Sequence, residues 1–323
     1  MTIEDQTIVA PDDIGEIVRR LGSATQQLEG KRVLLAGGCG FLGRYFLEVF
    51  TRLNAEVLEQ PVSVVAMDNL ITAAGVPETF SDNPHLEFVE HNIIEPWKPG
   101  GRFDHIIHAA GIASPFYYRA HPLETLDVAI SGTRNLLDLA REGQSHFVYF
   151  SSSEIYGDPD PAHVPTPESY CGNVSCVGPR ACYDEGKRVG ETLCQIYHNV
   201  HGVSVNVIRP FNIYGPGMKE RDFRVLPNFA SRIQGGQPLQ IYGTGKQTRT
   251  YCYITDAMVG FLKVLLNGVP SETYNIGNAH PEVSVQDLVK AMEAALGRAI
   301  ASDNVEHPDS YPADEPQRRC PNL

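Results

Sequence analysis

The sequence lacks three features: a surplus of positive charge, a long apolar run, and a cysteine pattern of the kind that holds zinc. It has 26 Lys and Arg against 39 Asp and Glu, a net charge of −13. Such an acidic chain argues against nucleic acid or a membrane surface as a partner, although net charge does not exclude a basic cleft for a phosphorylated small molecule. No run approaches the ~18 apolar residues of a membrane-spanning helix, so we expect no membrane segment.

The seven cysteines are scattered along the chain. The closest pair, Cys171 and Cys176, has no second pair at zinc-site spacing, so we expect no metal site. The first 22 residues contain no basic segment followed by an apolar core, unlike a signal peptide. An odd cysteine count without an export signal predicts reduced thiols and a cytoplasmic location.

Short apolar runs alternate with amphipathic segments between residues 31 and 209. Continuous apolar runs of this length are typical of buried parallel strands, and their alternation with helices predicts an α/β fold with a doubly wound parallel (Rossmann) sheet. The expected strands are 32–36, 62–67, 86–89, 105–109, 146–151 and 203–209, and the expected helices are 41–53, 122–142 and 180–200.

The pattern changes near residue 210, where glycine and proline become frequent and aromatic residues gather in FNIYGPG and IYGTGKQTRTYCYITD. We therefore expect three parts. Residues 1–30 form an N-terminal extension with a short amphipathic helix over 11–21, and residues 31–209 form a dinucleotide-binding Rossmann domain. Residues 210–323 form a smaller, less regular C-terminal lobe that mainly binds the substrate.

A glycine-rich loop joins the first expected strand to the first expected helix. In LLAGGCGFLGRY, Gly37, Gly40 and Gly43 let the backbone turn tightly and approach a pyrophosphate at the helix N-terminus. The second strand ends at Asp68, whose carboxylate suits ribose hydroxyls and repels a 2′-phosphate, although it also suits a simple turn. The loop and the acid together favour NAD as the cofactor; Arg44 is the one feature that would tolerate NADP.

Tyr183 and Lys187 in GPRACYDEGKR lie four residues apart and so share one face of the long expected helix. A neighbouring ammonium favours the phenolate, which makes tyrosine a better base at neutral pH. Most Y-x-x-x-K matches are solvated helix faces, so the pair alone predicts little.

The stretch FSSSEIYG places Ser152 and Glu154 at the end of the fifth strand, where ligands bind open α/β sheets. Three serines there also fit a loop that satisfies its own backbone. The glycine loop, the serine-rich strand end and the Tyr/Lys helix nevertheless occur in the order that a hydride-transfer enzyme needs.

These motifs resemble the extended short-chain dehydrogenase/reductase superfamily, and within it the chain is most similar to the UDP-glucuronate decarboxylase family. The sequence segments that match the family are GGCGFLGRY, MDNL, HNIIEP, IASPFYY, SSSEIYGDP, GPRACYDEGKRVGET, FNIYGPGM and DEPQRRCPNL. The resemblance implies that C4 of UDP-glucuronate is oxidised with NAD, that the β-keto acid loses CO₂, and that C4 is reduced again to give UDP-xylose. It also implies a homodimer that forms through the helices at 122–142 and 180–200.

The resemblance also implies roles by position. Tyr183 is the base, Lys187 supports it, and Ser152 completes the proton relay where the family usually has threonine. Glu154 matches an active-site glutamate, and Arg319 matches a C-terminal arginine whose fixed cation can stabilise the carboxylate and the enolate. The implied cofactor-binding residues are Gly37, Gly40, Phe41, Leu42, Gly43, Asp68, Asn69, Asn92, Ile93, Ala109, Tyr183 and Lys187. The implied substrate-binding residues are Ser114, Tyr118, Ser153, Asn212, Tyr242, Arg249 and Arg319.

Four positions depart from the family pattern and leave the identity of the sugar substrate open: Asp127, Ala129, Ser175 and Gly217. One alternative is therefore a 4-epimerase or a 4,6-dehydratase of the same superfamily, in which Glu154 would be the base at C5. Arg319 favours a substrate with a carboxylate over a neutral hexose. A second alternative is a non-enzymatic NAD(H)-binding regulator. A regulator would be expected to have lost some of the catalytic Tyr, Lys, Ser and Glu residues, but Tyr183, Lys187, Ser152 and Glu154 are all present.

Overall fold

A seven-stranded parallel sheet forms the centre of the computed structural model, which describes residues 9–73, 75–219, 224–306 and 316–323. The strand order is β11-β6-β5-β4-β1-β2-β3. The order reverses between β1 and β4, so the crevice for a ligand lies at the carboxyl ends of these strands. This sheet confirms the predicted doubly wound fold. Its strands are β1 (Arg32–Ala36), β2 (Ser63–Asp68), β3 (Leu86–Glu90), β4 (His105–His108), β5 (His146–Phe150), β6 (Val205–Pro210) and β11 (Thr273–Ile276).

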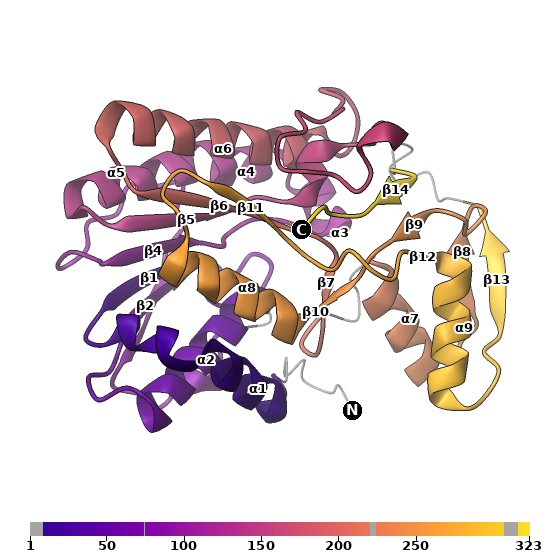
Figure 1. Cartoon of the computed structure of the whole chain (residues 1–323), viewed down its shortest axis with the longest axis horizontal. Helices are drawn as coiled ribbons and strands as arrows, with labels where there is room; N and C mark the ends of the chain where they lie inside the picture. The colour runs from indigo at the N-terminus through magenta and orange to yellow at the C-terminus, as the bar shows by residue number, and fades with distance from the viewer. Residues whose placement is uncertain (1–8, 74, 220–223, 307–315) are drawn as a thin grey trace.

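Helices cover both faces of the sheet (Figure 1). One face carries α1 (Pro11–Leu21), α2 (Phe41–Glu56) and α8 (Ile254–Asn267); the other carries α4 (Pro122–Asp127), α5 (Thr133–Gly143) and α6 (Ala181–His201). Successive residues of a strand point to opposite faces. Val33 and Leu35 of β1 accordingly join one hydrophobic core, and Leu34 and Ala36 join the other. Apolar residues therefore occupy β1 from Val33 to Ala36, because both faces of the strand are covered there.

The helix expected over 122–142 is divided in the structure. The π-helical segment η3 (Val128–Gly132) separates α4 from α5. A Cβ atom on Gly132 would lie 2.7 Å from Cδ1 of Ile93, and one on Gly186 of α6 would lie 3.2 Å from Ala129 Cβ. The wide turn thus lies where the chain packs closely against two other segments.

The chain beyond residue 210 contributes to both parts of the molecule. α8 packs on the sheet and β11 pairs with β6 in it. A separate lobe contains α7 (Val225–Gln234), α9 (Val285–Leu296), β8 (Leu239–Tyr242) and β13 (Ser302–Val305), around a small core that includes Phe229, Leu239 and Val285. Short pairings connect the two parts: β7 (Ile213–Tyr214) with β10 (Cys252–Tyr253), and β9 (Thr248–Arg249) with β12 (Val283–Ser284) and β14 (Arg318–Arg319).

The predicted N-terminal helix is present as α1, and it packs on α8 and α2. Arg20 Nη1 lies 2.7 Å from Asp256 Oδ1, and the Tyr253 hydroxyl donates to Asp13 Oδ2 over 2.9 Å. The extension is thereby joined to the beginning of α8.

Among the described residues, no helix combines the length and the apolar character needed to cross a membrane.

Candidate active site

The glycine loop after β1 is packed so tightly that side chains do not fit. Gly37 has φ of 87°, and a Cβ there would lie 2.6 Å from the backbone nitrogen of Ala110. A Cβ on Gly43, inside α2, would overlap the carbonyl of Gly37. Gly40 occupies the N-cap position of α2. The positive end of α2 is therefore reachable across bare backbone, as a pyrophosphate site requires.

A crevice of about 60 Å³ lies beside this loop, over the carboxyl ends of β1 and β2. The predicted cofactor residues that line it are Gly37, Gly40, Asp68, Asn69, Asn92, Ile93 and Ala109. The Asp68 carboxylate accepts from the backbone N–H of Cys39 (3.0 Å) and of Leu70 (2.8 Å). Asp68 therefore shapes the turn and also lines the crevice. A glycine cradle, a helix N-terminus and an acid at the end of β2 fit a dinucleotide.

A larger cavity of about 290 Å³ adjoins the crevice and extends toward the C-terminal lobe. The predicted residues that line it are Phe41, Leu42, Ala109, Tyr118, Ser152, Ser153, Glu154, Tyr183, Lys187, Asn212, Tyr242, Arg249 and Arg319. Two predicted residues line neither space. Gly43 packs beneath the loop, and Ser114 is buried at the N-cap position of α3 (Pro115–Ala120).

Tyr183 and Lys187 lie side by side on α6, and both are buried. The Tyr183 ring stacks on Tyr118 with centroids 5.6 Å apart. Lys187 Nζ lies 5.8 Å from the centre of the Tyr183 ring and donates to the Phe150 carbonyl over 2.7 Å. That carbonyl ends β5, two residues before Ser152. The lysine thus connects the proposed base to the serine-rich strand end.

Burial has opposite consequences for these two groups. It raises the pKa of Tyr183, while a hydrogen bond with Ser152 acts in the lowering direction. It lowers the pKa of Lys187 to about 8. Burial disfavours the charged form of each group. The phenolate therefore depends on the neighbouring ammonium and on the serine hydroxyl for its stability.

Glu154 lies between two arginines. Its carboxylate pairs with both terminal nitrogens of Arg319, Nη2 at 2.8 Å, and with Nη2 of Arg180. Arg319 lies on β14, where parallel pairing with β9 places it opposite Arg249. Arg180 precedes α6, and its Nε lies 3.5 Å from Oδ2 of Asp184. Three chain segments thus bring one acid and two guanidinium groups to a wall of the cavity.

Arg180 also lines the cavity, and no sequence motif predicts a role for it. The available signal was its spacing: it precedes Tyr183 by three residues, so a helical path would place both on one side. Its partner Glu154 comes from another segment, which no local pattern reveals.

The cavity is basic although the protein is acidic. Among the described residues that line it, Glu154 is the single acid, whereas the cations are Arg180, Lys187, Arg224, Arg249 and Arg319. Low-dielectric walls lined by one sign of charge concentrate ligands of the opposite sign. The cavity therefore suits an anion that carries charge at more than one place.

The lobe side of the cavity is ordered by backbone contacts. Asn212 has φ of 44°, and its Nδ2 donates to the Thr250 carbonyl over 2.8 Å. Arg249 is buried, and its Nη1 donates to the Thr248 carbonyl over 2.9 Å. Both side chains therefore have defined positions in the wall of the cavity.

The four departures from the family pattern lie away from the cavity wall. Asp127 and Ser175 are exposed, and the Ser175 hydroxyl donates to the Val177 carbonyl over 2.9 Å. Ala129 packs against α6, and Gly217 has φ of 89°. None of the four is among the residues that line the cavity.

Across the described part of the chain, no group of three or more His, Cys, Asp or Glu side chains is arranged to hold a metal.

Comparison with known proteins agrees with this geometry. Residues 33–277 match the NAD dependent epimerase/dehydratase family. UDP-glucuronic acid decarboxylase 3 of Arabidopsis thaliana is 35% identical over 293 residues, which cover 90% of this chain and 81% of that protein. UDP-glucuronic acid decarboxylase 1 of Xenopus tropicalis is 36% identical over 296 residues, 91% of this chain and 66% of that protein. The crystal structure of a dTDP-glucose 4,6-dehydratase from Streptomyces venezuelae, with NAD bound, superposes with a TM-score of 0.77 at 24% identity, covering 90% of this chain and 88% of that one.

Proposed function

Because the chain belongs to the NAD dependent epimerase/dehydratase family, we propose that it is an NAD-dependent decarboxylase that converts UDP-glucuronate to UDP-xylose. The observation that carries the proposal is the pair of arginines, Arg319 and Arg180, on Glu154 beside Tyr183. A neutral hexose needs no such concentration of guanidinium groups next to its reacting carbons, whereas a sugar carboxylate does.

The crevice and the glycine loop would hold NAD. Gly37, Gly40 and Gly43 would leave room for its pyrophosphate at the N-terminus of α2, and Asp68 and Asn92, which line the crevice, would hold its adenosine half. When bound, NAD supplies the acceptor for a hydride from C4 of the sugar and the donor for its return. The remaining steps fall to side chains of this protein.

Tyr183 takes the proton of the C4 hydroxyl in this proposal. Its phenolate is stabilised by the ammonium of Lys187 and by the hydroxyl of Ser152, which offset the cost of burial. When C4 is reduced again, the same phenol returns the proton. Tyr118 stacks against the ring and restricts its orientation.

Arg319 and Arg180 would recognise the C6 carboxylate and later stabilise the enolate that forms as CO₂ leaves. Fixed cations aimed at developing negative charge are effective in a buried site, because little reorganisation is needed. Glu154, held at the same place, would take up a proton from solvent and deliver it to C5, so that the proton that replaces CO₂ comes from water. The wall formed by Asn212, Arg249 and Tyr242 would hold the UDP pyrophosphate and nucleoside, with Arg249 suited to bidentate phosphate contact.

A test is to incubate the purified protein with UDP-glucuronate and NAD and to follow CO₂ and UDP-xylose by mass spectrometry. The proposal predicts both products. Turnover of a neutral UDP- or dTDP-hexose, together with none of UDP-glucuronate, would instead support the epimerase or dehydratase alternative. Retention of NAD without turnover of any nucleotide sugar would support a regulator.

We further propose a homodimer, a cytoplasmic location and the three-part division at residues 30 and 210, with α8 and β11 returning from the C-terminal part to the sheet. The exposed apolar side chains Val189, Ile196 and Val200 on one side of α6 support the dimer. The odd number of cysteines supports a reducing compartment. Sedimentation equilibrium tests the dimer: a monomer at micromolar concentration would contradict it.

A further inference from the structure

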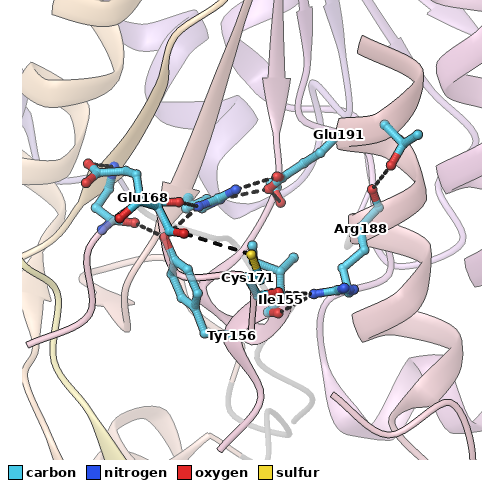
Figure 2. Close-up of polar contacts among 11 residues, drawn as sticks. Ile155, Tyr156, Glu168, Cys171, Arg188 and Glu191 are labelled. Carbon is cyan, nitrogen blue, oxygen red and sulfur yellow. Dashed lines mark hydrogen bonds and ion pairs between the residues drawn. The ribbon is translucent and has the colours of Figure 1, made fainter. Parts of the chain in front are cut away.

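The half-buried Glu191 of α6 belongs to a polar network with the buried Arg209 and Tyr156 (Figure 2). The carboxylate of Glu191 pairs with Arg209 at the end of β6 in a two-pronged contact, Nε to Oε1 at 2.9 Å and Nη2 to Oε2 at 2.6 Å. Arg209 also donates to the Tyr156 hydroxyl (2.7 Å), which donates to Asn275 Oδ1 of β11 (2.8 Å). The network therefore links α6 to three segments of the sheet edge.

Glu191 also holds the strand end that carries the serine motif. The buried hydroxyl of Ser151 donates to the Glu191 carboxylate, and Ser151 directly precedes Ser152. The preceding residue, Phe150, accepts from Lys187. Two side chains one helical turn apart on α6 thus fix consecutive residues of the same strand end. A displacement of Glu191 would be transmitted to Ser152 through one peptide unit.

The charge of Glu191 acts on Lys187, which follows from their i, i+4 spacing on α6. Within the part of the chain that the structure describes, the other groups that face Lys187 carry no negative charge. They are the Phe150 carbonyl and the Tyr149 ring from β5, the Tyr183 ring from α6, and His108 from β4. Burial lowers the pKa of His108 to about 3, so that it is neutral. Glu191 opposes the effect of burial on the pKa of Lys187, and it is the one side-chain charge among the described residues that does so.

We infer that Glu191 is a positioning residue for the reaction: it keeps Lys187 in its ammonium form and orients the Ser151–Ser152 strand end toward Tyr183. The inference rests on the proposed roles of Tyr183, Lys187 and Ser152. Glu191 itself is absent from the cavity lining and acts through these neighbours.

The sign of the expected change follows from the charge. Replacing Glu191 with glutamine keeps the shape and an acceptor for Arg209 but removes the negative charge. The pKa of Lys187, about 8 in the intact protein, then falls by about one unit, the lower end for loss of a nearby opposite charge. At pH 8 the ammonium fraction would fall from about one half to about one tenth, a fivefold loss.

The test titrates Lys187 directly and needs no substrate. The chain has only seven lysines, so ¹³Cε-lysine NMR can follow the titration of each one separately. The signal of Lys187 should titrate at a midpoint far below that of the exposed lysines, and its absence from Lys187→Met assigns it. We expect Glu191→Gln to lower this midpoint by about one unit. The matched control is Glu185→Gln, two residues from Lys187 but paired with Arg188 at the surface (3.5 Å). It should leave the midpoint unchanged.

An unchanged Lys187 midpoint in Glu191→Gln would overturn the inference, as would an equal shift in Glu185→Gln. If Glu191→Gln does not fold, the double variant Glu191→Gln/Arg209→Met removes both charges of the pair and avoids leaving the buried guanidinium of Arg209 unpaired. It should also lower the midpoint, by less than Glu191→Gln does, because loss of the Arg209 cation offsets part of the loss of the Glu191 charge that raises the pKa of Lys187.

Activity gives a second readout. The pH optimum of UDP-glucuronate turnover in Glu191→Gln should move in the acid direction, while Glu191→Asp, which keeps the charge, should restore it. An optimum that stays in place while the rate falls uniformly would reduce Glu191 to a structural residue. If the wild type does not turn over UDP-glucuronate, the proposed function fails, and the NMR titration still decides the role of Glu191.

Discussion

Arg319→Ala should separate the two chemical steps of the proposed reaction. Arg319 is buried and holds Glu154 with two nitrogens, so its cation acts where water screens little. The cation lies on the carboxylate side of the proposed site, whereas Tyr183 and Lys187 act at C4. Its loss should therefore impair the departure of CO₂ much more than the oxidation of C4.

The magnitude follows from the geometry. Removing one fixed group that stabilises developing charge typically lowers a rate by about 10²–10³. Arg180 stays on the same carboxylate, so we expect the lower end, about 100-fold in the decarboxylation step, or about 3 kcal/mol. C4 oxidation at saturating substrate should change by less than about fivefold, because its phenol, ammonium and serine are intact.

Single-turnover mixing measures both steps. NADH absorbance reports C4 oxidation, and quenched samples analysed by mass spectrometry report the 4-keto acid and UDP-xylose. NADH and the 4-keto acid should accumulate in Arg319→Ala. The control is Arg318→Ala, the neighbouring residue, which pairs with Glu282 at the surface at 2.9 and 2.7 Å and should leave both steps unchanged. Equal losses in the two steps would show that Arg319 only binds substrate and would refute this reasoning.

Two further substitutions test the Tyr183/Lys187 pair. Tyr183→Phe should abolish NADH formation while NAD affinity, measured by calorimetry, changes little; retained activity would remove Tyr183 from the mechanism. Lys187→Met should abolish activity yet raise the free energy of unfolding by up to about 3 kcal/mol at pH 7, because the folded protein no longer buries an ammonium. The pKa of Lys187 is about 8 when folded and 10.5 when unfolded. Denaturant titrations should therefore show the gain complete below pH 8 and disappearing between pH 8 and 10.5; a gain independent of pH would contradict this origin.

Most strands before residue 210 can be read from sequence because β1, β2 and β5 each contain a continuous apolar run of four residues, VLLA, VVAM and FVYF. β11 cannot be read in this way. Its sequence TYNI has the polar Asn275 at its centre, and it joins the sheet only by pairing with β6, far earlier in the chain. Asn275 is buried there because Tyr156 and the Thr166 carbonyl satisfy its amide. Such a partner set exists only after folding.

The same distinction applies to the site. Tyr183 and Lys187 follow from helical spacing, and Ser152 follows from the place where a strand ends. The pairing of Arg180 with Glu154, and of Glu191 with Arg209, joins segments that no periodic pattern connects. Arg319 is reached only through resemblance, because its approach to Glu154 depends on the pairing of β14 with β9.

The central claim is that the hydride leaves C4 and returns to it, with decarboxylation in between. The most direct measurement is to supply UDP-glucuronate deuterated at C4, in ordinary water, and then unlabelled substrate in D₂O. The account predicts UDP-xylose that keeps the deuterium at C4 in the first case and gains one solvent deuteron at C5 in the second. Loss of the C4 label, or a C5 without solvent deuterium, would contradict it.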